Sequence, residues 1–398
     1  MAFTPVPFSV DISVTAIEAI LARVRSFPFD RLRQPDGNDW RLGASVSYLR
    51  DLCAFWSSGY DWSMQQQLIN TAVQHIVEIE GVPIHFVYEP GSGTRPQPLL
   101  IMHGWPYSFH SYTPLIDRLA HPERHGGNIE DAFTVVVPSL PGYAFSGAPS
   151  KPIGPRRVTR MFNALMQELG LVEYIAHGGD WGGYMASLAG LDHARHVAGV
   201  HTTFLALRDS SAPLQTGDVA SDASQEEQAF VAREFALWKE QGAYAQVQST
   251  KPLALAPALL NNPVGVAAWI VDKFYAWSDQ RKRPFPSLFS HDQLITEIML
   301  YLVTDAFQTS IWLYAGQKAE GPVSLKPGQR VEVPTAIAAF PDPVFPMPPR
   351  AVAERTHNVV RYTEMPHGGH FPFYEAPELL IRDLQSFART LKPQGKMR

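Results

Sequence analysis

The sequence has only one cysteine, Cys53, among its 398 residues. A single cysteine excludes an internal disulfide and a metal site built from several cysteines. Functions that require a pair of cysteines, such as dithiol redox catalysis, are therefore excluded. The first eight residues, MAFTPVPF, lack the basic end and apolar run of a signal peptide, and Pro5 and Pro7 disfavour a helix there. These absences predict a soluble protein located in the cytoplasm.

An excess of basic residues is also lacking, since 33 Lys and Arg face 38 Asp and Glu for a formal net charge of -5. Nucleic acids and anionic membranes bind clustered Lys and Arg, so neither is expected as a partner. A membrane span needs about 20 apolar residues. The charge-free stretch 253–271 contains Pro257, Pro263 and two asparagines, which exclude such a span. The composition that remains, 45% hydrophobic and 18% charged, is typical of a globular protein.

Residues 1–73 are predicted to form a helical arm. Behind Ser13, a candidate N-cap, apolar side chains recur at the spacing of one helix face from Ile17 to Val24. The same spacing returns over residues 46–56. This arm is expected either to wrap the protein's own core or to contribute to a homodimer interface.

From residue 74 onward the pattern predicts a sheet, beginning with a β-hairpin that turns at Gly81. Strands that alternate with helices of about 10 to 15 residues imply a mostly parallel sheet, so the predicted fold class is α/β. The expected strands are 74–79, 84–88, 99–102, 133–137, 174–176, 197–203, 335–339 and 359–363. One helix is expected to end near residue 119, and three more are expected at about 158–169, 181–191 and 380–391.

The alternation breaks over residues 209–330, which are rich in helical pattern, Trp and Pro. Connections in α/β units usually take about 2 to 6 residues, so an interval of this length predicts an inserted helical lid. The expected core is therefore split into a first part, 74–208, and a second part, 331–398.

The most informative motif is HGGDWGG at residues 177–183, which follows a predicted strand and opens a predicted helix. This pattern is typical of a nucleophile elbow, in which a strained turn exposes the central side chain. Here the central residue is Asp180 instead of serine. Small residues at Gly178, Gly182 and Gly183 would let the helix approach the strand closely. We predict that Asp180 is a catalytic nucleophile; the alternative is a helix N-cap.

A second motif, HGWP at residues 103–106, directly follows the strand predicted at 99–102. In α/β-hydrolases the loop at this position supplies one backbone N–H of the oxyanion hole, and the residue after the nucleophile supplies the other. These donors would be Trp105 and Trp181. Pro106 is expected in the first turn of the following helix. The alternative is an ordinary strand-to-helix loop with a packed tryptophan.

A third motif, PHGGHF at residues 366–371, lies between the last predicted strand and the last predicted helix. Nucleophile, acid and histidine follow one another in this order in α/β-hydrolases, so a histidine here is expected to be the base. We assign that role to His370 and interpret His367 as a surface residue. Because no pair among the 14 histidines combines the spacing and the helical context of a zinc site, no metal or other cofactor is expected.

With these motifs the chain resembles the microsomal-type epoxide hydrolases, a branch of the α/β-hydrolase superfamily, over most of its length. The segments around Trp105, Asp180 and His370 are similar to the active-site signatures of that family, and their combination is specific. Residues 6–88 resemble the family's N-terminal region, and NPVG at 262–265 resembles part of its lid.

The resemblance implies that two lid tyrosines bind and protonate the epoxide oxygen. These roles fall on Tyr244 and Tyr314, with Tyr301 as a substitute. A phenol with a pKa near ~10 stays protonated at neutral pH and can donate to an alkoxide. Packing within an aromatic lid is the alternative explanation for either tyrosine.

The resemblance also implies an acid that orients His370. The family usually places Asp or Glu two residues after a Phe-Pro pair, whereas FPDP at residues 340–343 has its carboxylate one residue early. We assign this role to Asp342, on the expectation that the flanking prolines reorient the loop.

Together these residues predict an epoxide hydrolase that produces a vicinal diol. Asp180 would attack a small apolar epoxide, and water activated by His370 would hydrolyse the resulting ester. A hydrolytic dehalogenase with the same aspartate is one alternative, although a leaving halide needs no tyrosine. An inactive hydrolase-fold binding protein is another, motivated by the displaced Asp342.

Overall fold

The structure is a computed structural model that describes residues 3–33, 40–209, 216–321, 324–326 and 328–392. Within these residues the main sheet has nine strands, in the order β1-β2-β3-β5-β4-β6-β7-β10-β11. The strands are β1 (Val6–Phe8), β2 (Gln74–Ile79), β3 (Val82–Glu89), β4 (Gln97–Met102), β5 (Phe133–Pro138), β6 (Tyr174–Gly178), β7 (Val197–Thr202), β10 (Val331–Ala339) and β11 (His357–Glu364).

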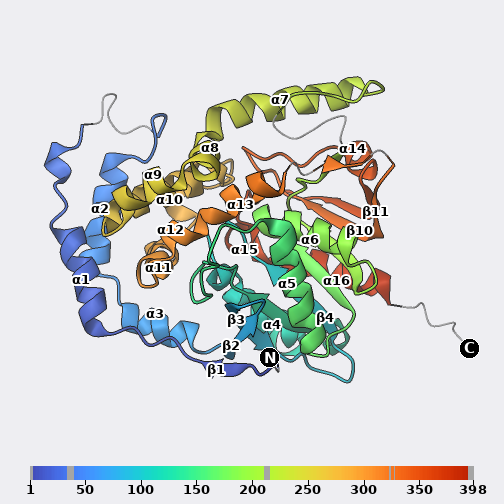
Figure 1. The fold of residues 1–398 in the computed structure, drawn as a ribbon, viewed down its shortest axis with the longest axis horizontal. Helices are drawn as coiled ribbons and strands as arrows, with labels where there is room; N and C mark the ends of the chain where they lie inside the picture. The colour runs from blue at the N-terminus through green and yellow to red at the C-terminus, as the bar shows by residue number, and fades with distance from the viewer. Residues whose placement is uncertain (1–2, 34–39, 210–215, 322–323, 327, 393–398) are drawn as a thin grey trace, which may run out of the picture.

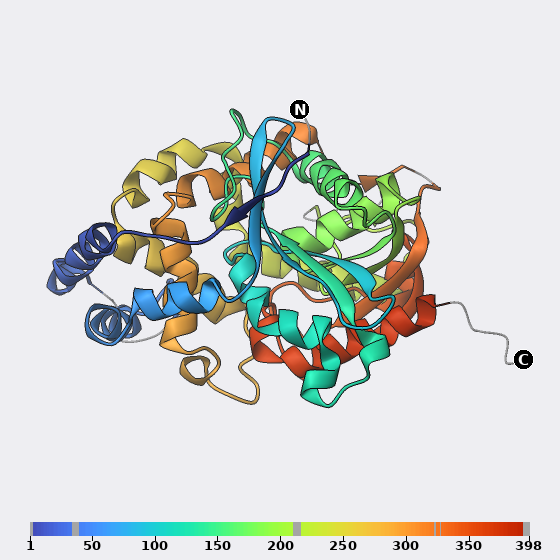
Figure 2. The ribbon, with the colours of Figure 1, turned by 90° about the horizontal axis from the view of Figure 1, so that it is seen from below.

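The sheet has an antiparallel end and a parallel body. β1, β2, β3 and β5 pair in antiparallel fashion, whereas the pairs from β5 through β4, β6, β7 and β10 to β11 are parallel. Helices α5 (Pro155–Glu168) and α6 (Asp180–Asp192) cover one face, and α4 (Thr113–Ala120) and α16 (Pro377–Leu391) cover the other (Figure 2). The predicted α/β fold class is confirmed, and the carboxyl ends of the parallel strands meet at one edge.

The arm contains the helices that the apolar spacing predicts, α1 (Val14–Arg25) and α2 (Val46–Ser58), followed by α3 (Trp62–Ile69). The hydroxyl of Ser13 accepts the N–H of Ala16, as expected of an N-cap. Strand β1 was not predicted, because prolines at both 5 and 7 argue against a strand. An edge position with only three residues accommodates Pro7.

The arm packs against the lid (Figure 1). The rings of Trp40 and Tyr275 stack with centroids 4.1 Å apart, and the hydroxyls of Tyr60 and Thr296 are 3.1 Å apart. These contacts are with the lid, so both alternatives for the arm, wrapping the protein's own core and contributing to a homodimer interface, stay predictions.

Helices dominate the described part of the predicted lid. They are α7 (Gln225–Gln241), α8 (Ala243–Thr250), α9 (Pro252–Leu259), α10 (Pro263–Trp277), α11 (His291–Leu302), α12 (Phe307–Ser310) and α13 (Trp312–Glu320). At the base, the short strands β8 (Arg208–Asp209) and β9 (Ser324–Leu325) pair in parallel, which the sequence did not indicate. The division of the chain into arm, core and lid stays a prediction.

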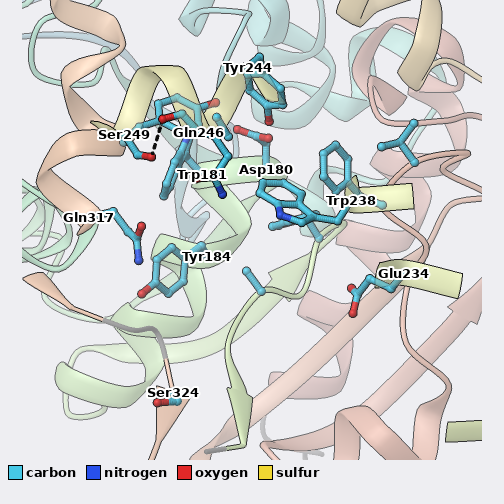
Figure 3. Close-up of a pocket in the computed structure, with 16 residues that line it drawn as sticks. Asp180, Trp181, Tyr184, Glu234, Trp238, Tyr244, Gln246, Ser249, Gln317 and Ser324 are labelled. Atoms are coloured by element: carbon cyan, nitrogen blue, oxygen red, sulfur yellow. Dashed lines mark hydrogen bonds between the residues drawn. The ribbon is translucent and has the colours of Figure 1, made fainter. Parts of the chain in front are cut away.

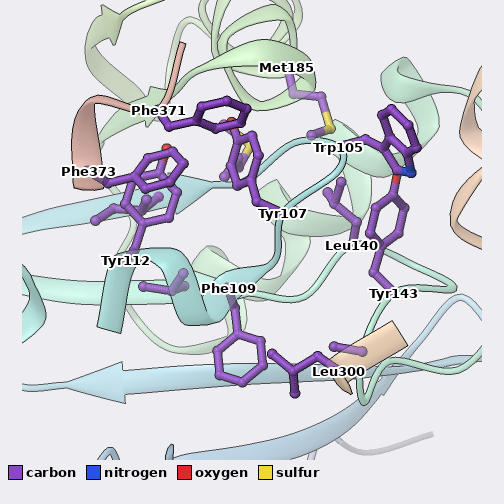
Figure 4. Close-up of a cluster of buried hydrophobic side chains, with 14 of the residues drawn as sticks. Trp105, Tyr107, Phe109, Tyr112, Leu140, Tyr143, Met185, Leu300, Phe371 and Phe373 are labelled. Carbon is purple, nitrogen blue, oxygen red and sulfur yellow. The ribbon is translucent and has the colours of Figure 1, made fainter. Parts of the chain in front are cut away.

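The hydrophobic core reaches directly beneath the loops that follow β4 and β11. Trp105, Tyr107 and Phe109 of the first loop are fully buried, and Tyr107 contacts Phe371 of the second with ring centroids 5.9 Å apart (Figure 4). Both loops are thus anchored in the core by aromatic side chains, which restricts their movement. Among the described residues no helix has the length and apolar character required to cross a membrane.

Candidate active site

Asp180 lies on the turn that joins β6 to α6, as the motif predicts. Its backbone has a φ of 50°, in the left-handed region that a non-glycine residue rarely adopts. The helix approaches the sheet so closely that a Cβ on Gly182 would lie 1.8 Å from the carbonyl oxygen of Met102. A Cβ on Gly178 would lie 2.3 Å from the backbone of Gly182. The glycines therefore permit the sharp turn that lifts the Asp180 side chain from the sheet edge.

Two groups hold the Asp180 carboxylate. The backbone N–H of Trp105 donates to its Oδ1 at 2.9 Å, and the His370 Nε2 lies 3.2 Å from its Oδ2. Gly104 makes the first contact possible, because a Cβ there would lie 2.3 Å from Oδ1. The N–H of Trp105 thus points at the place where charge would develop on an ester of Asp180.

The surroundings of the two predicted oxyanion donors differ. Trp181 is in the first turn of α6, where backbone N–H groups have no partner within the helix. The Trp105–Pro106 peptide bond is cis. The expected placement of Pro106 in a helix is wrong: the next helical residues are the 3₁₀ turn Phe109–Tyr112, because the core aromatics fix the intervening loop.

Asp342 reaches His370 despite its early position in the sequence. Its Oδ2 lies 2.6 Å from the His370 Nδ1. Its Oδ1 accepts the N–H groups of Val344 and Phe345, both at 2.8 Å. The carboxylate therefore turns back over the loop it begins, which leaves one oxygen for the histidine.

His370 bridges the two carboxylates and is itself buried, with 5% of its surface exposed. Burial lowers its pKa, but Asp342 and Asp180 outweigh that effect and raise the pKa to about 10. At neutral pH the imidazole is therefore protonated. The aromatic rings of Trp277 and Phe345 lie 4.9 Å and 5.3 Å from the imidazole and shield it from solvent.

The structure brings Tyr244 of α8 and Tyr314 of α13 together above the nucleophile. Their ring centroids are 5.9 Å apart, and both rings contact Trp105, at 5.2 Å and 6.0 Å respectively. Burial, with the charge of Asp180 as a further cause, raises the pKa of both phenols well above 10. Both phenols are therefore protonated and able to donate.

Tyr301, the substitute considered from the sequence, is directed elsewhere. Its hydroxyl donates to the backbone carbonyl of Tyr107 at 3.2 Å, in the core below the loop. That assignment is unsupported by the geometry, because a hydroxyl engaged with the backbone is not available to a substrate.

A cavity of about 230 Å³ opens above the nucleophile. In Figure 3 the Asp180 carboxyl group points into it beside the hydroxyl end of Tyr244. Its lining is mainly apolar near Asp180, and Gln246, Ser249 and Gln317 are polar groups on the lid. The aromatic and aliphatic part of the lining consists of Trp181, Tyr184, Phe204, Ala206, Trp238, Tyr244, Ala245, Tyr314, Val344 and Phe345.

Sequence reasoning missed most of these lining residues. Phe204, Trp238 and Phe345 come from a loop, a lid helix and another loop, and no motif links them. It also missed Glu375, a buried carboxylate beside the histidine loop. A glutamate five residues after a motif histidine was the available signal, but its spacing alone indicates no contact.

Two protein-family models match this chain, and a curated protein is similar to nearly all of it. A family model described as "Epoxide hydrolase N terminus" matches residues 5–112, and one described as "alpha/beta hydrolase fold" matches residues 97–250. Epoxide hydrolase 1 of Sus scrofa is 33% identical over 409 residues, which cover 98% of this chain and 89% of the pig protein.

Solved structures resemble the whole chain. The epoxide hydrolase of Aspergillus niger superposes with a TM-score of 0.82 at 28% identity, covering 98% of this chain and 97% of the fungal one. The juvenile hormone epoxide hydrolase of Bombyx mori has a TM-score of 0.81 at 24% identity, covering 98% and 94%. The first likeness extends to sequence, and the second concerns the fold alone.

Proposed function

The chain belongs to the epoxide hydrolase family of α/β-hydrolases, and from this membership we propose that it opens its epoxide through a covalent ester on Asp180. The observation that supports this route is a carboxylate held between the N–H of Trp105 and the imidazole of His370. Carboxylate suits the task, since its ester has a carbonyl that water can attack and the ether of a serine would not.

The first step is attack on an oxirane carbon by Oδ2 of Asp180. Oδ1 is the oxygen that already accepts the N–H of Trp105, so it becomes the carbonyl oxygen of the ester. The carbon–oxygen bond of the oxirane breaks as the new bond forms. Tyr244 or Tyr314 donates its proton to the departing oxygen, which becomes the first hydroxyl of the diol.

Ester formation changes His370. It removes the negative charge of Asp180, which is one of the groups that raise the pKa of His370. The imidazolium can then return a proton to the tyrosinate, and the neutral imidazole becomes a base. In this order the Asp180 carboxylate faces a protonated His370 before it reacts. His370 becomes a neutral base only after the ester has formed.

The second step is hydrolysis of the ester. His370 takes a proton from water as the hydroxide adds to Cγ of Asp180, and Trp105 with Trp181 stabilises the resulting oxyanion. Collapse of this intermediate breaks the bond between Cγ and Oδ2, so that Oδ2 leaves with the alkyl group as the second hydroxyl oxygen of the diol, and the proton of the new acid moves to this leaving oxygen. Asp342 stabilises the imidazolium each time it forms, and the enzyme returns to its starting charge state.

The family acts on epoxides with water, and we infer that the epoxide for this chain is small and apolar. The support is the cavity of about 230 Å³ with aromatic walls next to Asp180. An apolar substituent would be desolvated between Trp181 and Phe204 while its oxirane oxygen faces Tyr244.

The decisive experiment is a single turnover of an epoxide in water labelled with 18O, followed by mass analysis of the peptide that contains Asp180. The ester route places the label in Asp180, because water attacks its Cγ. Label found only in the diol, with none in the peptide, would mean direct attack of water on the epoxide and would end the proposal.

A further inference from the structure

Four consecutive backbone N–H groups around the catalytic histidine have acceptors supplied by two other segments. Gly368 donates to Oδ2 of Asp279 at 3.2 Å, and His370 donates to the carbonyl of Trp277 at 2.9 Å. Gly369 and Phe371 donate to the carboxylate of Glu375, the latter at 3.0 Å. The backbone that carries the imidazole is therefore fixed residue by residue.

Glu375 also reaches the lid. Its second oxygen accepts the N–H of Asp279 at 2.7 Å, and Asp279 follows the end of α10. One buried carboxylate thus joins the histidine loop to the lid segment after Trp277. The histidine loop and the lid segment are in close contact at Gly369, because a Cβ there would lie 2.6 Å from the nitrogen of Asp279 and 2.7 Å from the oxygen of Trp277.

The chemistry of the reaction does not use Glu375. The hydrogen bonds of its carboxylate go to backbone N–H groups, while the imidazole of His370 is bonded to Asp342 and Asp180. Only 6% of its surface is exposed, so keeping a carboxylate there costs free energy unless its hydrogen bonds are satisfied. Because Glu375 has this desolvation cost and no chemical role, its function is best explained by the backbone segments that its hydrogen bonds hold in place.

We propose that Glu375 is a positioning residue for His370, which fixes the imidazole where it can take a proton from the attacking water. The proposal rests on the ester mechanism above. It predicts a selective effect: the alkylation step depends on Asp180 and the tyrosines, whereas ester hydrolysis depends on the placement of His370. Loosening the loop should therefore slow the second step and spare the first.

The test is Glu375→Gln in the full-length enzyme, with both steps measured by rapid quenching and mass analysis of the Asp180 peptide. The amide keeps the size of the side chain but turns an NH₂ group toward a backbone N–H donor. We expect hydrolysis of the ester to slow by about 10- to 100-fold, as misplacement of a catalytic group by about 1 Å does. Alkylation should stay within about threefold of wild type, so kcat and KM fall together.

Two further variants make the result specific. Glu375→Asp keeps the charge and should recover part of the hydrolysis rate. Glu378→Gln is the matched control, because Glu378 is three residues away, largely exposed and paired with Arg118 on α4. It should leave both steps unchanged.

An equal loss in both steps, or unchanged hydrolysis in Glu375→Gln, would overturn the inference. If that variant does not fold, Asp279→Asn loosens the same loop from the Gly368 side and must show the same split between steps. Absence of any ester in the wild-type enzyme would refute the ester mechanism itself, whereas ester that decays normally in the variants would refute only the role of Glu375.

Discussion

At the scale of single residues, charge explains how one histidine can be both a stable part of the fold and a base. The resting imidazolium lies between the carboxylates of Asp180 and Asp342. Because the imidazole is buried among aromatic rings, removing either carboxylate would leave a buried charge unpaired, at a cost in free energy. The sequence supplied Asp180 and His370 through their motifs. It left Asp342 uncertain in geometry, because only the folded loop shows that the Oδ1 of Asp342 is occupied by Val344 and Phe345.

The raised pKa of His370 predicts a dependence of stability on pH. A group whose pKa is higher in the folded state stabilises the fold fully below its unfolded pKa, near ~6.5 for histidine, and this stabilisation is lost as pH rises through the folded pKa. For wild type that loss extends to about pH 10. One proton corresponds to a slope of up to about 1.4 kcal/mol per pH unit.

Asp180→Asn removes one of the charges that raise the pKa of His370. In this variant the stabilisation contributed by the His370 proton should therefore be lost completely at a lower pH than in wild type. Denaturant unfolding between pH 6 and pH 10 would show the free-energy difference between variant and wild type shrinking toward the alkaline end. Glu378→Gln, on the exposed side of α16, should give a constant difference. A constant difference for Asp180→Asn as well would contradict the assigned charge state.

At the scale of elements, periodicity and turn residues predicted most of the sheet and its flanking helices. Strands β4, β5, β6, β7 and β10 each contain a short apolar run, which is why sequence predicts their existence. The short pairs involving β1 and β8 could not be predicted, since two or three residues carry no periodic signal. The packing of the lid helices could not be predicted from sequence either, and this packing determines that Tyr244 and Tyr314 lie in contact.

The meeting of α8 and α13 predicts shared work by their tyrosines. Tyr244→Phe and Tyr314→Phe each leave one phenol to protonate the oxirane oxygen, so each should slow alkylation by about 10- to 100-fold or less. The double variant should have no measurable diol production. Tyr301→Phe is the matched control, because its hydroxyl bonds the carbonyl of Tyr107, and it should keep its alkylation rate. Diol formation at the wild-type rate by the double variant would remove the tyrosines from the mechanism.

At the scale of the whole molecule, the arm, lid and catalytic loops form one connected structure. Trp40 of the arm stacks on Tyr275 of α10, and that helix ends at Trp277. The ring of Trp277 contacts His370 at 4.9 Å and Tyr244 at 5.3 Å. A contact far from the chemistry therefore supports the helix that lies against both the base and a proton donor.

Trp40→Ala should consequently lower both stability and rate. Loss of a partly buried stacked tryptophan is expected to reduce the free energy of unfolding by about 2 kcal/mol, less than the cost at a fully buried site. Alkylation and ester hydrolysis should slow by similar factors, since α10 contacts residues of both steps, in contrast to the selective effect expected of Glu375→Gln. Thermal unfolding and the two single-turnover rates measure this. Met64→Ala, an arm residue that is 57% exposed, should change neither; wild-type rates in Trp40→Ala would show that the arm does not support the site.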